Sequence, residues 1–196
     1  MKKLAVNMKN KIAKCIRVLT TAPVAALVLV TVLYALMPSS FAGKLHFLAA
    51  ILFLTVLPIL AYPVSYLLPN KKYRAREEQR RLAILFAIVG YVGGAAFGLL
   101  CGGARIEILI YLTYLASGAM IALNTRLKIK SSGHACGVSG PITLLTYCLG
   151  APFSAGYLLL IAVYWSSLQL KRHTVGQLVT GTAIPIVAMF ILKAMV

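Results

Sequence analysis

Long stretches with few or no charged residues dominate the hydrophobic pattern of the chain. Each is close to the roughly 20 residues that an α-helix needs to cross the hydrocarbon core of a bilayer. Seven such segments are predicted as membrane-spanning helices: 18–37, 45–68, 82–101, 106–123, 133–149, 152–168 and 175–195. The pattern therefore predicts an all-α, polytopic membrane bundle of about seven helices, with short connections between antiparallel neighbours.

The first apolar segment has a second interpretation, as a signal peptide. The small residues of Ser40-Phe41-Ala42 follow it and resemble a cleavage site, and cleavage would leave six helices. The apolar core of a signal peptide is about 7–15 residues long, whereas this segment has about 20. We therefore expect a retained first helix.

Prolines and glycines fall inside several predicted spans. Pro58 and Pro63 lie within the second span, where neighbouring helices of a bundle can satisfy the carbonyls that proline leaves unpaired. Glycines recur in the third and fifth spans, at positions 90, 93, 94, 98, 133, 137 and 140. Small residues at such positions allow helix backbones to approach closely, so these spans are expected to pack tightly.

Composition and charge add an orientation to this picture. The 196 residues are 61% hydrophobic and 12% charged, with a formal net charge of +17. The Lys and Arg residues lie between apolar segments, and 17 fall on one predicted face against 3 on the other. This asymmetry predicts a multi-pass protein of the cell membrane with its N-terminus and basic face in the cytoplasm. Nucleic-acid binding is excluded as a partner class, because no soluble scaffold carries the basic segments into a groove.

The same charges suggest three parts of the chain. Residues 1–17 form a basic cytoplasmic N-terminus, and residues 18–123 hold the first four helices with a solvated basic loop at 69–81. Residues 124–196 form the last part, with polar motifs at 126–134 and 166–177. The oligomeric state is left open.

Neither cysteines nor carboxylates form the pattern of a metal site. The four cysteines show no CxxC pair and no histidine at metal-ligand spacing, so they are expected to be reduced side chains within helices, with palmitoylation an alternative for Cys15. Only Glu77, Glu78 and Glu107 are acidic, and two of them lie in the charged loop. No metal or other cofactor is therefore expected.

Two of the three histidines stand where chemistry is expected. His134 and His173 each open a predicted helix directly after basic residues, and two intervening spans return them to the same face. Helix N-termini and basic side chains both attract anions, so the two segments predict a phosphate site at headgroup depth. His46 has no polar neighbour in sequence and is expected to be an interfacial residue.

The segment from Asn124 to Thr182 resembles the type 2 phosphatidic acid phosphatase (PAP2) superfamily, which shares a helical-bundle core with vanadium haloperoxidases. The resemblance is carried by Ser132-Gly133-His134 at the start of one helix and by Lys171-Arg172-His173-Thr174-x-x-Gln177 at the start of another. It implies a PAP2-like core for this part of the chain.

The resemblance also implies roles. His173 would attack phosphorus and form a phosphohistidine, His134 would protonate the leaving alkoxide, and Gln177 would orient the nucleophile. Phosphoryl oxygens would be held by a set of neighbouring groups: Lys130, Ser132, Gly133, Arg172, Arg126 and Lys128. The substrate would be a membrane lipid, either phosphatidate or a polyprenyl phosphate or diphosphate.

The chain departs from the family pattern at three positions. Ser167 stands where the family has an arginine, Gln177 where it has an aspartate, and Ser131 where it has a proline. The departures at Ser167 and Gln177 favour one alternative, a catalytically inactive relative that binds anionic lipid headgroups. A small transporter subunit is a second alternative, although almost no ionisable group lies within the predicted spans.

Overall fold

The computed structural model describes the backbone of residues 2–127 and 129–196, and their side chains except those of residues 2–6, 71, 76 and 80. Within these residues the chain forms helices and no strand. The α-helices are α1 (Lys2–Leu19), α2 (Ala22–Leu36), α3 (Lys44–Ile51), α4 (Leu57–Leu67), α5 (Arg76–Leu100), α6 (Arg105–Arg126), α7 (Gly133–Leu149), α8 (Leu159–Gln169) and α9 (Val175–Leu192). Four short helical segments connect them: η1 (Pro38–Ser40), η2 (Leu52–Val56), η3 (Lys71–Arg74) and η4 (Ala151–Leu158).

Several of these helices have the length and apolar character of membrane spans. Five stretches of the described residues qualify: Lys44–Leu67, Glu77–Leu100, Arg105–Arg126, Ala151–Gln169 and Val175–Leu192. A sixth is added if α1 and α2, which meet at a bend of 49°, act as one span. α7 has the predicted bounds but only 17 residues. The all-helical, multi-pass character is confirmed, and a count of seven spans stays a prediction.

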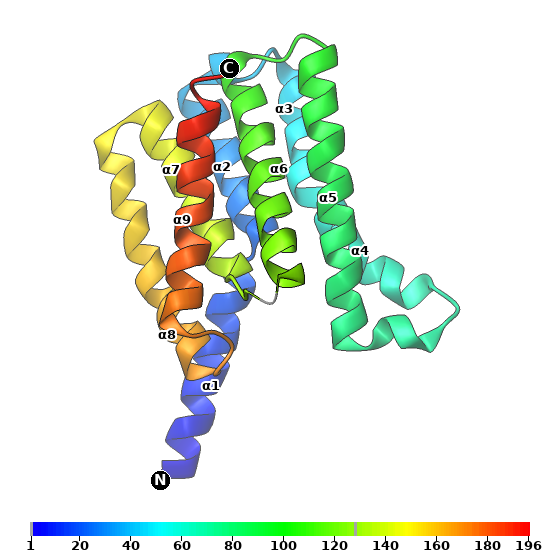
Figure 1. The fold of residues 1–196 in the computed structure, drawn as a ribbon, viewed down its shortest axis with the longest axis vertical. Coiled ribbons are helices and arrows are strands. Elements are labelled where there is room, and N and C mark those ends of the chain that lie inside the picture. Colours follow the sequence, from blue (N-terminus) through cyan, green and yellow to red (C-terminus); the bar gives the residue numbers. More distant parts are fainter. Residues whose placement is uncertain (1, 128) are drawn as a thin grey trace.

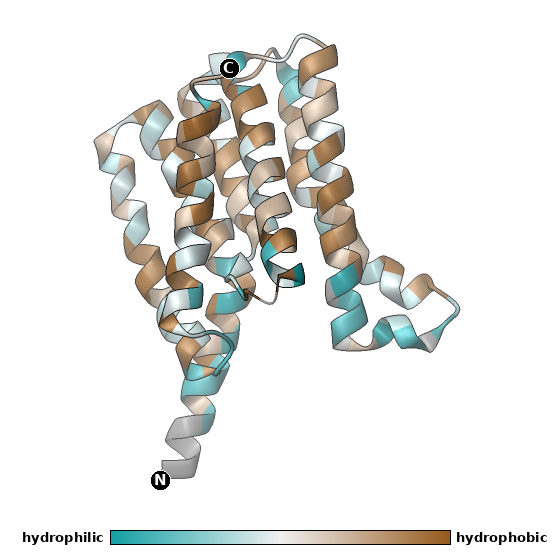
Figure 2. Cartoon of the chain, in the orientation of Figure 1, coloured by the Kyte–Doolittle hydropathy of each residue, from teal (hydrophilic) through white to brown (hydrophobic). Residues whose placement is uncertain are grey.

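The helices form one bundle, with α7 and α9 against each other near its middle (Figure 1). α2 packs against α7, α6 against both α5 and α9, and α1 against α8. Figure 1 shows α1 extending from one end of the bundle, while the C-terminus lies at the opposite end. Hydrophilic residues gather on α1 and around the turn between α4 and α5, and apolar residues fill the helices above them (Figure 2).

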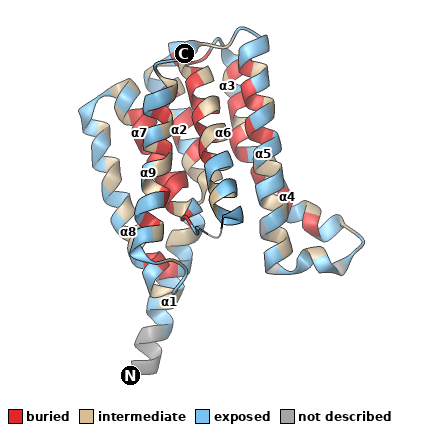
Figure 3. Ribbon diagram, in the orientation of Figure 1, coloured by how far each residue is buried: buried red, intermediate tan, exposed pale blue. Residues whose placement is uncertain are grey.

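α7 is the best-buried helix, and its small residues explain why. Every residue from 135 to 145 is buried. Figure 3 shows the buried residues gathered where the helices of the bundle face one another. A Cβ added at Gly137 would come within 2.7 Å of the Ala22 Cβ, and one at Gly140 within 3.2 Å of the Pro185 Cβ. Glycine at both positions therefore lets α2 and α9 close directly onto α7.

The second predicted span is continuous but contains a π-helical turn. This turn, η2, ends two residues before Pro58. Proline has no N–H and its ring crowds the carbonyl four residues earlier, so an α-helix cannot continue through it undisturbed. A Cβ at Gly90 on α5 would collide with the carbonyl of Phe53 in this turn, so the glycine leaves room for the turn.

The bounds of the helices do not coincide with the bounds of the three predicted parts of the chain. The basic N-terminus is not a separate segment, because α1 continues through Arg17 to Leu19. The loop at 69–81 is largely helical, since it holds η3 and the first turns of α5. The boundary at 123/124 falls inside α6, so the first and last parts belong to one bundle.

Candidate active site

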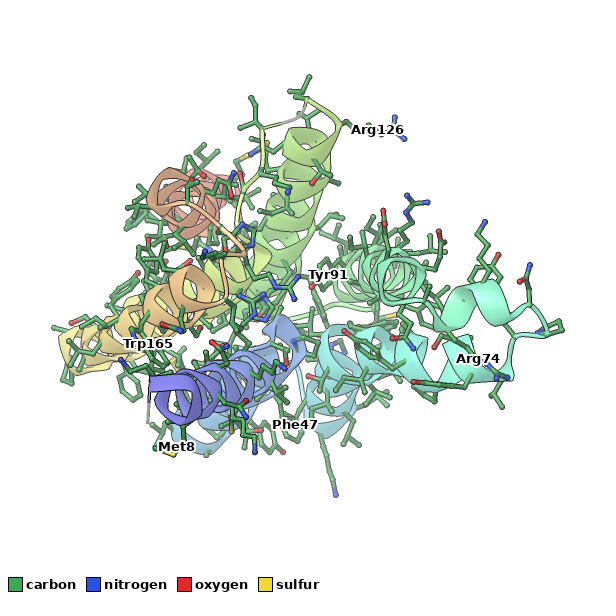
Figure 4. The ribbon with its side chains drawn as sticks, turned by 90° about the horizontal axis from the view of Figure 1, so that it is seen from below. Met8, Phe47, Arg74, Tyr91, Arg126 and Trp165 are labelled. Carbon is green, nitrogen blue, oxygen red and sulfur yellow. The ribbon has the colours of Figure 1, made fainter. Side chains whose placement is uncertain are left out.

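The N-termini of α7 and α9 are joined by a backbone hydrogen bond at the end of the bundle from which α1 extends. The Ser132 N–H donates to the Gln177 carbonyl over 2.8 Å. A Cβ at Gly181 would collide with the Ser132 carbonyl, so glycine permits this approach. The contact brings His134 and His173 to the same end of the bundle, as the sequence predicted, and Figure 4 looks onto this end.

His173 is held by the glutamine one helical turn after it. Its Nδ1 lies 3.1 Å from Gln177 Oε1. The same oxygen accepts the Thr174 N–H over 3.3 Å, while the Thr174 hydroxyl accepts the Gln177 N–H over 3.4 Å. Because Oε1 can only accept, Nδ1 carries the proton and the lone pair of a neutral ring is on Nε2. The expected contact between Gln177 and the His173 ring is confirmed.

Arg17, which in the sequence is one of several basic residues before the first apolar segment, reaches the other histidine. Arg17 lies in the last turn of α1. Its Nη1 donates to Ser167 Oγ on α8 over 2.9 Å, and its Nη2 lies 3.4 Å from His134 Nδ1. Ser167 is the position where the PAP2 pattern has an arginine. In this chain a guanidinium from a different helix, that of Arg17, lies beside the serine.

Both ring nitrogens of His134 face Arg17. A guanidinium donates only, so Nδ1 accepts, and Nε2–H donates to the Arg17 carbonyl over 3.0 Å. That carbonyl belongs to the last turn of α1, where the break before α2 leaves carbonyls without helical partners. In this arrangement His134 is neutral and ties the end of α1 to the start of α7.

The predicted phosphate-binding residues are only partly brought together. Lys130 and Arg172 are exposed near the two helix starts, and Gly133 has open space where a side chain would be. Ser132 is fully buried and its hydroxyl accepts the Ala135 N–H over 3.3 Å, as the N-cap of α7. Arg126 extends outward from the bundle (Figure 4).

Lys128, also predicted to bind phosphate, lies outside the described residues. The connection that contains it is anchored by a hydrogen bond of 2.9 Å from Asn124 Nδ2 to Ser131 Oγ. Ser131 stands where the family pattern has a proline, and here its hydroxyl holds the connection against the end of α6.

A third histidine contact lies at the opposite end of the bundle. His46 Nδ1 is 2.9 Å from Glu107 Oε1, and both residues are buried. Glu107 Oε2 accepts the Ala42 and Ala104 N–H groups over 3.4 and 3.3 Å. His46 therefore has a polar partner that its local sequence cannot show, because Glu107 lies 61 residues away. Its expected position at the membrane interface stays a prediction.

Among the described residues, no group of three or more His, Cys, Asp or Glu side chains is placed to hold a metal ion. Comparison of the chain with models of known families, with curated proteins and with solved structures found no match.

Proposed function

We propose that the chain is a membrane-embedded lipid phosphate phosphatase of the PAP2 type, with His173 as its nucleophile. The observation that carries the proposal is the hydrogen bond between His173 Nδ1 and Gln177 Oε1. A ring oriented in this way directs the Nε2 lone pair, which is what an attack on phosphorus requires. The exposed Lys130 and Arg172 add positive charge suited to a phosphate.

The reaction would proceed in two steps. Nε2 of His173 attacks phosphorus, the bond from phosphorus to the lipid oxygen breaks, and the alkoxide takes up a proton. Water then hydrolyses the phosphohistidine and releases inorganic phosphate. His134 is the candidate donor of the proton, and for this role it must exchange its contacts with Arg17 for a protonated state facing the lipid oxygen.

The Arg17–His134 contact favours a second candidate function. With Nδ1 accepting from a guanidinium and Nε2–H donating to a carbonyl, His134 acts as a structural tie between α1 and α7. A chain in which this tie is permanent would bind anionic lipid headgroups at its basic end without hydrolysing them.

Phosphate release from purified protein tests the two candidates. The substrates are phosphatidate, a polyprenyl phosphate and a polyprenyl diphosphate. The proteins compared are wild type, His173→Ala, Gln177→Ala and Gln177→Asp. His173→Ala should fall to background, because the attacking nitrogen is lost. Gln177→Ala should lose roughly 10–100-fold, as for other groups that orient a reacting histidine. Gln177→Asp should retain or raise turnover, since a carboxylate also stabilises an imidazolium.

Gln169→Ala is the matched control, because this glutamine at the same end of the bundle bonds to Asn10 and not to a histidine. Wild-type turnover in His173→Ala would refute the site. No release from any lipid, together with binding of a fluorescent phosphatidate by the purified protein in detergent, would select the inactive binding protein instead.

A further inference from the structure

A cavity of about 360 Å³ opens beside the start of α7 and runs into the bundle. Its walls come from α5, α6, α7 and α9 and from Ala22 at the start of α2. Gly133 and Thr125 lie at its basic end, and Pro141 and Pro185 line it farther along α7 and α9. None of the described residues that line it carries a charge, so the cavity suits the uncharged part of a lipid rather than its phosphate.

Three hydroxyls on the α6 wall of this cavity lack a satisfying partner. Thr113 Oγ1 and Tyr114 OH are buried without a hydrogen bond to any described residue, and Ser117 Oγ has only the Cys136 thiol beside it. Ser117 lies beside the Cys136 thiol, which is a weak hydrogen-bonding group. Thr113 is 1% exposed and Tyr114 7%. Unpaired buried hydroxyls are unfavourable, so their presence indicates a ligand that pairs with them.

The three hydroxyl-bearing residues line the same cavity as Gly133, one of the candidate phosphate-binding residues. Cys136 is three residues into α7, about one helical turn from Gly133. Tyr114 packs edge-on against Tyr91 of α5, with ring centroids 5.4 Å apart, and Figure 4 shows Tyr91 between α5 and the rest of the bundle. A lipid with its phosphate at Gly133 would therefore place the next few atoms of its backbone beside these side chains.

We propose that this cavity receives the glycerol backbone and ester carbonyls of a diacyl lipid phosphate, so the ligand class is a glycerophospholipid and not a polyprenyl phosphate. The inference rests on the proposed phosphate site. Ester carbonyls accept hydrogen bonds and donate none, which matches hydroxyl donors in an otherwise apolar wall. They follow the phosphate by a few bonds, whereas a prenyl chain carries no acceptor. The acyl tails would continue between helices into the bilayer.

A pair of lipids that differ only in the carbonyls tests the inference. Binding of a fluorescent phosphatidate to the purified protein is measured in competition with unlabelled lipids. The competitors are ester-linked phosphatidate, its ether-linked analogue with the same chain length, and polyprenyl phosphate. Wild type should prefer the ester over the ether by roughly tenfold, as expected for one or two neutral hydrogen bonds. Tyr114→Phe and Thr113→Val keep the side-chain shapes and should each reduce the preference, and the double variant should remove most of it.

Tyr66→Phe is the control, since this tyrosine is exposed on α4 and does not line the cavity. Equal binding of ester and ether lipids by wild type would overturn the inference, whether or not the variants fold. Competition by polyprenyl phosphate as strong as that by phosphatidate would also overturn it. Phosphate release is measured in parallel: ester preference without release refutes only the phosphatase, and release without ester preference refutes only this inference.

Discussion

At the residue scale, the basic end of the bundle depends on contacts between groups far apart in the chain. Arg17 and His134 are separated by 117 residues, and Arg17 and Ser167 by 150. Local sequence suggested only that Arg17 was one of several basic residues before an apolar segment. Its partners are decided by the packing of α1 on α8, which the hydrophobic pattern does not encode.

Replacing Arg17 should therefore affect stability more than replacing its neighbours on α1. Arg17→Ala removes a charge-assisted hydrogen bond to Ser167 and the contact to His134, so the free energy of unfolding should fall by about 1–3 kcal/mol. Arg17→Lys should recover only part of this loss, because an ammonium lacks the fork that reaches two acceptors. Thermal unfolding of the purified protein in one detergent measures the difference.

Lys14→Ala is the comparison for Arg17→Ala, since Lys14 is exposed one turn earlier on α1. Equal stability of the Arg17→Ala and Lys14→Ala variants would show that the guanidinium does not hold the helices together.

At the element scale, the helices were the most predictable feature. The bounds of α7 agree with the expected segment at 133–149, because an apolar run, a serine N-cap and a closing glycine are all local signals. The π-helical turn before Pro58 and the helical character of the 69–81 segment were not predicted. Both features depend on how α3, α4 and α5 pack against one another. The hydrophobicity of a single segment does not determine which helices pack against it.

Two glycines on α9 should respond differently to alanine. At Gly181 the added Cβ would collide with the Ser132 carbonyl, whereas Gly176 has open space around it. Gly181→Ala should thus separate α7 from α9 and destabilise the protein by about 1–3 kcal/mol through overpacking. Gly176→Ala should be neutral or stabilising by up to about 1 kcal/mol, since alanine favours a helix more than glycine does.

Thermal unfolding of both variants, with phosphate release measured alongside, distinguishes these cases. A Gly181→Ala protein as stable as Gly176→Ala would contradict the close packing of α7 against α9.

At the scale of the whole molecule, the distribution of charge predicts how the bundle sits in its membrane. The hydrophilic end carries α1 and the turn between α4 and α5, and the opposite end carries the C-terminus (Figures 1 and 2). The count of 17 basic residues against 3 predicts that the hydrophilic end faces the cytoplasm. Sequence could predict this asymmetry because it depends only on the order of spans and loops, not on their packing.

Native cysteines offer a direct measurement of this orientation. Cys15 is exposed on α1, and Cys101 is exposed at the other end of the bundle, as the C-cap of α5. With Cys136 and Cys148 replaced by alanine, proteins that retain only Cys15 or only Cys101 are treated in intact cells with a membrane-impermeant maleimide. Cys101 should react in intact cells, and Cys15 only after permeabilisation. The reverse labelling would place the candidate active site outside the cell.

The buried contact between His46 and Glu107 bears on the order in which helices enter the membrane during synthesis. An ionised carboxylate that enters a bilayer alone is costly, and a growing chain forms its structure from the N-terminus onward. His46 precedes Glu107 by 61 residues, so α3 is already made when the N-terminal end of α6 leaves the ribosome. We therefore expect α3 to be in the membrane before α6 inserts, so that His46 can pair with Glu107 during insertion. In a variant that lacks α3, Glu107 would enter the membrane without its imidazole partner. We expect the membrane insertion of α6 to fail in that variant before the insertion of any other helix does.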